Sequence, residues 1–212
     1  AVMSYAVKEM FLTLQGEGVQ AGRRAGFVRF AGCNLWSGRE EDRANAICRF
    51  CDTDFVGMDG LGGGRFADAA ALVAAVVEMW AGAATERFVV LTGGEPMLQV
   101  DDALVDALHA AGFFIAIESN GTLPVHPGIN WVCISPKAGS ETVQRSGDEL
   151  KLVWPQPGSE VDAMERWDFT HHLIQPLDDP QADANREAAV ALVMERPRWR
   201  LTLQTHKMLG LR

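Results

Sequence analysis

Three of the four cysteines, Cys33, Cys48 and Cys51, fall in one short stretch of the chain. Cys48 and Cys51 have two residues between them, a spacing at which both thiolates can bind one metal centre, and a 14-residue excursion, residues 34–47, separates them from Cys33. In a reducing compartment, clustered thiols bind metal or carry out redox chemistry more often than they form disulfides. The spacing therefore predicts a metal centre held by three thiolates.

The missing fourth ligand limits what this centre can be, because a structural zinc site and an ordinary four-iron cluster both need four. The fourth cysteine, Cys133, lies inside an apolar segment, where a buried and inert thiol is expected. A zinc site of three cysteines and one histidine stays open as an alternative. Its histidine would come from far along the chain: His109, His126, His171, His172 or His206. A four-iron cluster with one iron open to a small-molecule ligand fits the three thiols better.

The elements that must position the thiols follow a repeated pattern, in which an apolar, β-branched segment ends in glycine or polar residues. Strands are predicted at residues 5–14, 26–33, 87–96, 113–121, 129–137, 149–155, 171–179 and 199–207, and helices at 66–80, 98–112, 159–168 and 180–197. Strands that alternate with helices form right-handed βαβ units around a parallel sheet. The polar ends of these strands, and Cys33, would then meet at one face, where parallel α/β folds bind ligands.

Length and composition are those of one globular domain spanning residues 1–212, with residues 34–47 as an insertion. The chain is 48% hydrophobic and 22% charged, and it has no apolar run long enough to cross a bilayer. No secretion signal is recognisable, so a cytoplasmic location is expected. The net charge of −9 argues against a nucleic-acid partner and favours a small ligand whose anionic groups meet individual Arg or Lys residues.

Short motifs besides the cysteines occur in a specific order from about residue 10 to the C-terminus. They are Leu14-Gln15-Gly16-Glu17-Gly18, the strand with Arg29, Phe50 before Cys51, Thr92-Gly93-Gly94-Glu95-Pro96, Glu118-Ser119-Asn120-Gly121, Ser135-Pro136-Lys137, Gln175-Pro176 and Gln204-Thr205-His206-Lys207. Together they resemble the 7-carboxy-7-deazaguanine synthase family of the radical S-adenosylmethionine (SAM) superfamily. The superfamily's usual spacing is Cys-x3-Cys-x2-Cys, and an expanded first gap also occurs within this family. The resemblance implies an α/β fold, a partial parallel β/α barrel.

The resemblance also implies a reaction. Three thiolates would hold a 4Fe-4S cluster whose open iron takes SAM, and the 5′-deoxyadenosyl radical made from SAM would remove hydrogen from carbon 6 of 6-carboxy-5,6,7,8-tetrahydropterin. Ring contraction and loss of ammonia would give 7-carboxy-7-deazaguanine, a step of queuosine and 7-deazapurine biosynthesis. Mg²⁺, a homodimer and an electron donor such as flavodoxin or ferredoxin are expected on the same ground.

The resemblance also implies which residues of this chain would contact the cofactors. Gly94, after Gly93, would let backbone approach the methionine end of SAM, although a plain strand-to-helix turn is the alternative. Ten residues would lie against the adenosyl, ribose and adenine groups: Phe50, Cys51, Asp52, Ser135, Pro136, Lys137, Gln175, Pro176, Leu177 and Asp178. For those from Ser135 onward, loop capping is the alternative. Thr53 occupies the position of the Mg²⁺ ligand, and a helix N-cap or turn is its alternative.

For the substrate, Arg29 offers a planar donor fork that suits a carboxylate, with an exposed strand arginine as the alternative. Leu14, Gln15 and Gly16, together with Glu17 and Thr92, would contact the pterin edge. Glu17 and His206 are the candidate catalytic residues, although His206 is as well explained as a structural histidine. Two other functions stay open: another radical SAM enzyme, such as a glycyl-radical activase, and a non-catalytic zinc-binding module.

Overall fold

The computed structural model describes residues 4–212, and within them one nine-stranded sheet has the order β3-β1-β2-β4-β5-β6-β7-β8-β9. Its strands are β1 Tyr5–Leu14, β2 Arg24–Phe30, β3 Gly64–Phe66, β4 Phe88–Gly93, β5 Phe114–Ser119, β6 Trp131–Ile134, β7 Ser146–Trp154, β8 Asp168–Pro176 and β9 Trp199–Leu201. All neighbours from β2 to β9 pair in parallel, whereas β1 is antiparallel to both β2 and β3. Because β3 and β9 are edges, the barrel is not closed.

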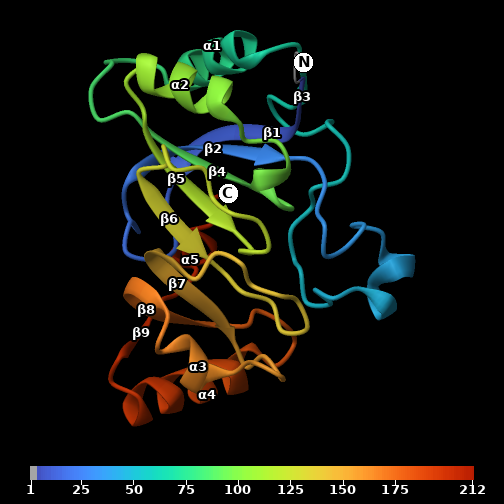
Figure 1. The fold of residues 1–212 in the computed structure, drawn as a ribbon, viewed down its shortest axis with the longest axis vertical. Helices are drawn as coiled ribbons and strands as arrows, with labels where there is room; N and C mark the ends of the chain where they lie inside the picture. The colour runs from blue at the N-terminus through green and yellow to red at the C-terminus, as the bar shows by residue number, and fades with distance from the viewer. Residues whose placement is uncertain (1–3) are drawn as a thin grey trace.

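Helices pack on both ends of this curved sheet, as Figure 1 shows, with α1 and α2 at one end and α3 and α4 at the other. The helices are α1 Ala69–Trp80, α2 Asp102–Ala110, α3 Val161–Met164, α4 Ala182–Glu195 and α5 Thr205–Met208, with 3₁₀ turns η1 Glu40–Asn45 and η2 Pro96–Leu98. Asp68 and Asp101 cap α1 and α2 by accepting hydrogen bonds from the backbone N–H groups of Ala71 and Leu104. None of the helices in residues 4–212 is long and apolar enough to span a membrane.

Two apolar clusters form the core. The larger lies between β1, β2, β4 and β5 and the helices α1 and α2, and the smaller lies between β7, β8 and β9 and the helices α3 and α4. Val89 and Val90, which are neighbours on β4, are both fully buried, because a parallel strand is covered on both faces. The polar ends of the strands are left at one edge of this core.

The predicted α/β class, with a mostly parallel and incompletely closed sheet, is confirmed. Some details differ. β1 runs antiparallel to β2 because the loop of residues 15–23 is too short for the crossover that a parallel pair requires. The predicted helix 159–168 is only the single turn α3, and the short strand β3 was not predicted.

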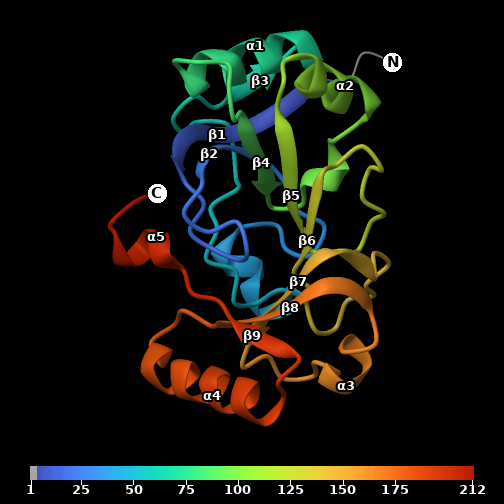
Figure 2. The ribbon, with the colours of Figure 1, turned by 90° about the vertical axis from the view of Figure 1, so that its left-hand side faces the viewer.

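The predicted strand at 199–207 is wrong beyond Leu201, because the chain leaves the sheet there and forms α5. The reason is a long-range contact: the backbone N–H and the hydroxyl of Thr205 both donate to the carbonyl of Gly16, each at 2.9 Å. Figure 2 shows α5 beside the loop that follows β1, although 189 residues separate Thr205 from Gly16. This contact places the C-terminal segment over the ends of the parallel strands.

Candidate active site

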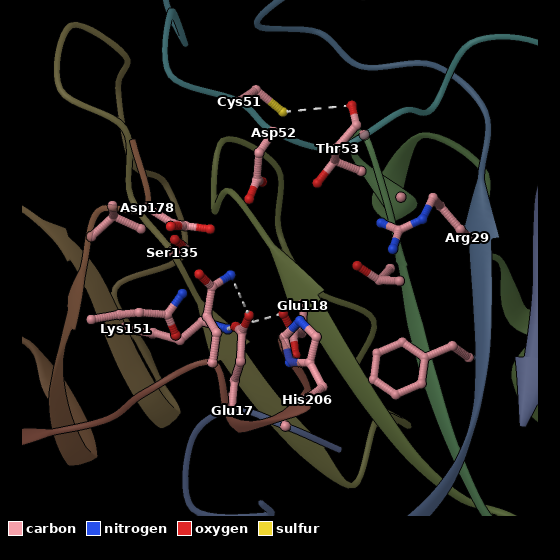
Figure 3. A pocket seen from close by; sticks show the side chains of 18 of the residues that line it. Glu17, Arg29, Cys51, Asp52, Thr53, Glu118, Ser135, Lys151, Asp178 and His206 are labelled. Atoms are coloured by element: carbon pink, nitrogen blue, oxygen red, sulfur yellow. Dashed lines mark hydrogen bonds and ion pairs between the residues drawn. The ribbon is translucent and has the colours of Figure 1, made fainter. Parts of the chain in front are cut away.

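The parallel strands end at a cavity of about 560 Å³ that collects most of the residues singled out in the sequence (Figure 3). Those that line it are Leu14, Gln15, Gly16, Glu17, Arg29, Cys48, Phe50, Cys51, Asp52, Thr53, Thr92, Gly94, Ser135, Lys137, Gln175, Pro176, Leu177, Asp178 and His206. Two predicted residues, Cys33 and Pro136, lie outside this lining. The carbonyl of Pro136 accepts a hydrogen bond from the Gln156 side chain at 3.4 Å.

The three cysteines gather on one side of the cavity, in the loops that follow β2. The loop after β4 packs directly on the first of them, because a Cβ at Gly94 would lie 2.6 Å from the Cβ of Cys33. Burial raises the pKa of Cys33, whereas a hydrogen bond from the Cys48 thiol lowers the pKa of Cys51 to about 6. Cys133 is buried separately in β6.

This donor set fits a cluster with three thiolate ligands. Cys33, Cys48 and Cys51 are free of disulfide bonds and come from one segment of the chain, and Cys48 and Cys51 line the cavity. In residues 4–212, no group of three or more His, Cys, Asp or Glu side chains is arranged to hold a single metal ion. Because Cys48 and Cys51 line the cavity, a cluster bound by the thiols would face the space that the other predicted residues line.

A network of ion pairs forms the floor of the cavity around Lys151 of β7. Lys151 is only 4% exposed. The Lys151 ammonium pairs with Glu17 and lies 3.0 Å from Glu118 Oε2. The Gln204 and Gln15 side-chain amides donate to Glu17 and Glu118 respectively, each at 3.0 Å. One cation thus holds two carboxylates in place, and both line the cavity.

The network fixes the charge of its members. Burial alone would raise the pKa of Glu17, but the charge and hydrogen bond of Lys151 outweigh burial and hold that pKa at about 2. Burial opposes the charged form of Lys151 as well, yet Glu118 and Glu17 raise its pKa well above the usual value. Glu17 is therefore an ionised hydrogen-bond acceptor at neutral pH.

His206, on α5, lies directly against Gly16 at the mouth of this network. A Cβ at Gly16 would lie 2.1 Å from the His206 Nδ1 atom, so only glycine leaves room for the ring. Figure 3 shows the imidazole beside Glu17 and Glu118. The structure thus brings together the two candidate catalytic side chains, Glu17 and His206, from opposite ends of the sequence.

Arg29 and Thr92 are direct partners in the pairing of β2 with β4. The Nε of Arg29 donates to Glu9 Oε1 at 2.9 Å, which turns the guanidinium toward the cavity. Within residues 4–212 its terminal amino groups make no hydrogen bond. Phe11 and Phe27 stack nearby with ring centroids 5.5 Å apart and supply an apolar, planar wall.

The opposite wall joins three segments through lysines. Lys207 of α5 lies 3.0 Å from Asp52 and 2.5 Å from Asp178, so it connects the loop after Cys51 with the end of β8. Lys137 donates to the Ser135 hydroxyl at 2.6 Å. Burial lowers the pKa of Lys137.

Sequence reasoning did not assign site roles to Lys151, Glu118, Glu9, Gln204 or Lys207, although all five line the cavity. For Lys151 a signal was present, because a lysine between Leu150 and Leu152 in an apolar strand must be buried with a partner. Glu9 and Lys207 carried no such signal, since each has a polar neighbour, Lys8 or His206, instead of apolar residues on both sides.

An open, mostly parallel sheet with three thiols in the segment after the carboxyl end of β2 defines a radical SAM-type α/β protein. A comparison with protein-family models finds no match. The 7-carboxy-7-deazaguanine synthases of Burkholderia multivorans and Caulobacter vibrioides are 59% and 58% identical to the chain over 209 residues, covering 99% of this chain and 100% of each relative. The crystal structure of QueE from Escherichia coli has a TM-score of 0.68 and 27% identity, covering 95% of this chain and 94% of that one. The chain belongs to the 7-carboxy-7-deazaguanine synthase family, as its motifs predict.

Proposed function

We propose that the protein is a radical SAM lyase that converts 6-carboxy-5,6,7,8-tetrahydropterin to 7-carboxy-7-deazaguanine with loss of ammonia, in queuosine and 7-deazapurine biosynthesis. The observation that carries the proposal is one cavity that has the cysteine loop on one wall and Arg29, Glu17 and His206 on another. Its volume of about 560 Å³ is in the range of pockets that hold small molecules. Family membership favours this function over the zinc-binding and activase alternatives.

Cys33, Cys48 and Cys51 would hold a 4Fe-4S cluster and leave one iron to SAM. When bound, these two groups supply the 5′-deoxyadenosyl radical that starts the reaction. The chain's own part is to place SAM. Gly94 lets the loop after β4 pack directly against Cys33, and Asp52, Ser135 and Asp178 offer polar atoms that line the cavity. The other residues proposed to contact SAM on this wall are Phe50, Cys51, Lys137, Gln175, Pro176 and Leu177.

The substrate would lie between Arg29 and the ion network. The guanidinium of Arg29 presents its terminal N–H groups to a carboxylate, and Thr92 stands beside it. The ionised Glu17 accepts hydrogen bonds from the N–H groups of the pterin edge, beside the backbone of Leu14 to Gly16. His206 then has the position to hold or deliver a proton at the ring. The two stacked phenylalanines exclude water from one side.

Magnesium forms part of the proposal. Thr53 lines the cavity directly after Cys51 and Asp52, and a hard cation with few protein ligands suits a site where a substrate carboxylate completes the oxygen shell. Turnover should fall when Mg²⁺ is removed by a chelator and return when it is added back. In Thr53→Val, a larger Mg²⁺ concentration should be needed for half-maximal rate. Unchanged Mg²⁺ dependence in that variant would exclude Thr53 as a ligand.

A homodimer, an electron donor such as flavodoxin or ferredoxin and a cytoplasmic location complete the proposal. Light scattering of the purified protein decides the first of these, since a homodimer has twice the mass of the 23.1 kDa chain. A reduced flavodoxin or ferredoxin should replace a chemical reductant in turnover. Failure of both proteins to support turnover would point to a different donor.

Anaerobic turnover tests the function itself. Protein reconstituted with iron and sulfide, and given SAM, a reductant and the carboxytetrahydropterin, should release 7-carboxy-7-deazaguanine and ammonia. Cleavage of SAM with the pterin unchanged would contradict the assignment and favour another radical SAM enzyme. Zinc without iron or labile sulfide in anaerobically purified protein would favour the zinc-binding module.

A further inference from the structure

The excursion between the first two cluster cysteines is closed at its base. The backbone carbonyl of Leu35 accepts hydrogen bonds from the N–H groups of Ile47 and Cys48, at 3.2 and 3.4 Å. The chain therefore leaves Cys33 and returns to the same place, and Cys48 is buried where it returns. Residues 34–47 form a closed lobe attached to the thiols, which Figure 1 shows projecting beside the sheet.

Arg43, on the 3₁₀ turn η1 of this lobe, reaches across to the loop that carries the second and third thiols. Its Nη1 atom donates to the carbonyl of Arg49 at 2.8 Å and to the carbonyl of Cys51 at 3.1 Å. These two carbonyls lie on either side of Phe50, within the Cys48-to-Cys51 segment. One guanidinium nitrogen thus fixes two points of a loop that has no regular secondary structure.

The guanidinium of Arg43 is itself held on its other sides. Its Nε lies 2.8 Å from both carboxylate oxygens of Glu40, and its plane lies over the Trp36 ring at 4.2 Å from the centroid. Trp36 is 8% exposed and meets Phe55 edge-on at 5.6 Å. Arg43 is therefore held by the face of the buried Trp36 ring and by the exposed Glu40 carboxylate while it donates to the loop.

The same lobe packs on the chain just after the third thiol. A Cβ at Gly38 would lie 2.3 Å from Val56 Cγ2 and 3.0 Å from Phe55 Cε2, so backbone of the lobe touches these side chains directly. The lobe thus makes two contacts. Arg43 contacts the Cys48-to-Cys51 loop, and Gly38 contacts the segment that follows this loop. Both sides of Cys51 are fixed by residues of the excursion.

We propose that residues 34–47 are a clamp that holds the Cys48-to-Cys51 loop in the conformation that binds the cluster, with Arg43 as the positioning residue. The inference rests on the proposed cluster site. Groups that orient metal ligands set affinity, and their loss typically costs about 10–100-fold in affinity or activity. Lysine cannot replace Arg43 fully, because an ammonium has no planar face for Trp36 and no fork to bridge Glu40 and the carbonyls.

Cluster retention tests the clamp without using turnover. Wild type, Arg43→Ala, Arg43→Lys and the control Arg39→Ala would be reconstituted anaerobically, and the decay of the cluster absorbance would be followed after addition of an iron chelator. Arg39 is a suitable control because it belongs to the same lobe, carries the same charge and has a side chain that is 70% exposed. Unfolding of each apoprotein would be measured in parallel.

The expected result is a cluster loss about tenfold faster or more in Arg43→Ala, a smaller increase in Arg43→Lys, and the wild-type rate in Arg39→Ala. The reduced cluster's electron paramagnetic resonance spectrum should also change in Arg43→Ala while the apoprotein unfolds like wild type. Wild-type cluster lifetime in Arg43→Ala would overturn the clamp and leave the proposed function intact. A wild-type protein that binds no cluster would instead overturn the proposed function.

Discussion

Lys151 and Glu17 form a buried ion pair although 134 residues separate them in the chain. The pair ties the loop between β1 and β2 to β7, on the opposite half of the sheet. Since Glu118 of β5 shares the same ammonium, three separate segments meet at one charge. The floor of the cavity is therefore a single electrostatic unit, and it joins folding stability to the geometry of the site.

Removing the cation should leave two mostly buried carboxylates, Glu17 and Glu118, without their partner. Lys151→Met should lose about 3–5 kcal/mol of unfolding free energy, measured by urea denaturation at pH 8, because a buried charge without its partner is costly. Lys207→Met is the matched control: its ion pairs are exposed, so it should lose at most about 1 kcal/mol. Equal losses in the two variants would contradict the description of the floor as buried.

The pH dependence of the unfolding free energy should differ in sign between wild type and Lys151→Met. In wild type the folded pKa of Glu17 is about 2, below its ordinary value of 4.5, so the stability that the pair provides is present above pH 4.5 and is lost as pH falls toward 2. In Lys151→Met, burial would raise the pKa of Glu17, so the variant should become less stable as pH rises above 4.5. Urea denaturation at pH 5 and pH 8 measures this, and a variant no more stable at pH 5 would contradict the assigned coupling.

Gly16→Ala should displace His206 while leaving the fold intact. The added Cβ would meet the imidazole at 2.1 Å, and misplacing a catalytic group by about 1 Å can cost about 100-fold in rate. Gly22→Ala in the same loop is the control, because its Cβ meets no atom within 4 Å but its φ of +90° is unfavourable for alanine. Gly22→Ala should lose stability and keep its turnover rate. Full turnover in Gly16→Ala would show that His206 has no role in the reaction.

Arg29→Lys tests recognition of the substrate carboxylate. A lysine keeps the charge but presents no planar fork, so KM for the pterin should rise about tenfold or more. Arg24→Lys, on the same strand but bonded to the carbonyl of Trp80, should leave KM unchanged. Steady-state kinetics at saturating SAM measures both. If Arg29→Lys keeps the wild-type KM, the carboxylate binds elsewhere.

Cysteine substitutions separate the cluster ligands from the buried thiol. Cys33→Ala, Cys48→Ala and Cys51→Ala should each lose most of the bound iron and sulfide and all turnover, whereas Cys133→Ala should keep both. Iron and labile sulfide per chain are the measurement. The ligand assignment fails if Cys48→Ala turns over at the wild-type rate.

The sequence predicts the strands well because parallel strands buried on both faces are written as continuous apolar runs, such as Val89 to Leu91. It also predicts that their polar ends meet, since the carboxyl ends of parallel strands share one edge. The fate of residues 202–207 could not be predicted in this way. That segment reads as a strand, but long-range contacts hold it outside the sheet, among them those of Thr205 with Gly16 and of Gln204 with Glu17.

Side-chain partners are the part that pattern reasoning misses. The ion network depends on Lys151 reaching Glu17 and Glu118 from different strands, and no local spacing encodes those distances. The purpose of the 34–47 excursion was likewise hidden, because Arg43 resembles any surface arginine until its two carbonyl partners are located. The motifs therefore predict which segments meet, whereas the structure is needed to see how they are held.

Isotope transfer from the pterin to SAM is the sharpest test of the proposed reaction. Reconstituted protein would be given SAM, a reductant and 6-carboxytetrahydropterin that carries deuterium at carbon 6, and the products would be analysed by mass spectrometry. The expected products are 7-carboxy-7-deazaguanine and regenerated SAM that carries deuterium on the 5′ carbon of its adenosyl group. SAM cleavage that yields unlabelled 5′-deoxyadenosine, with the pterin intact, would contradict the proposed reaction.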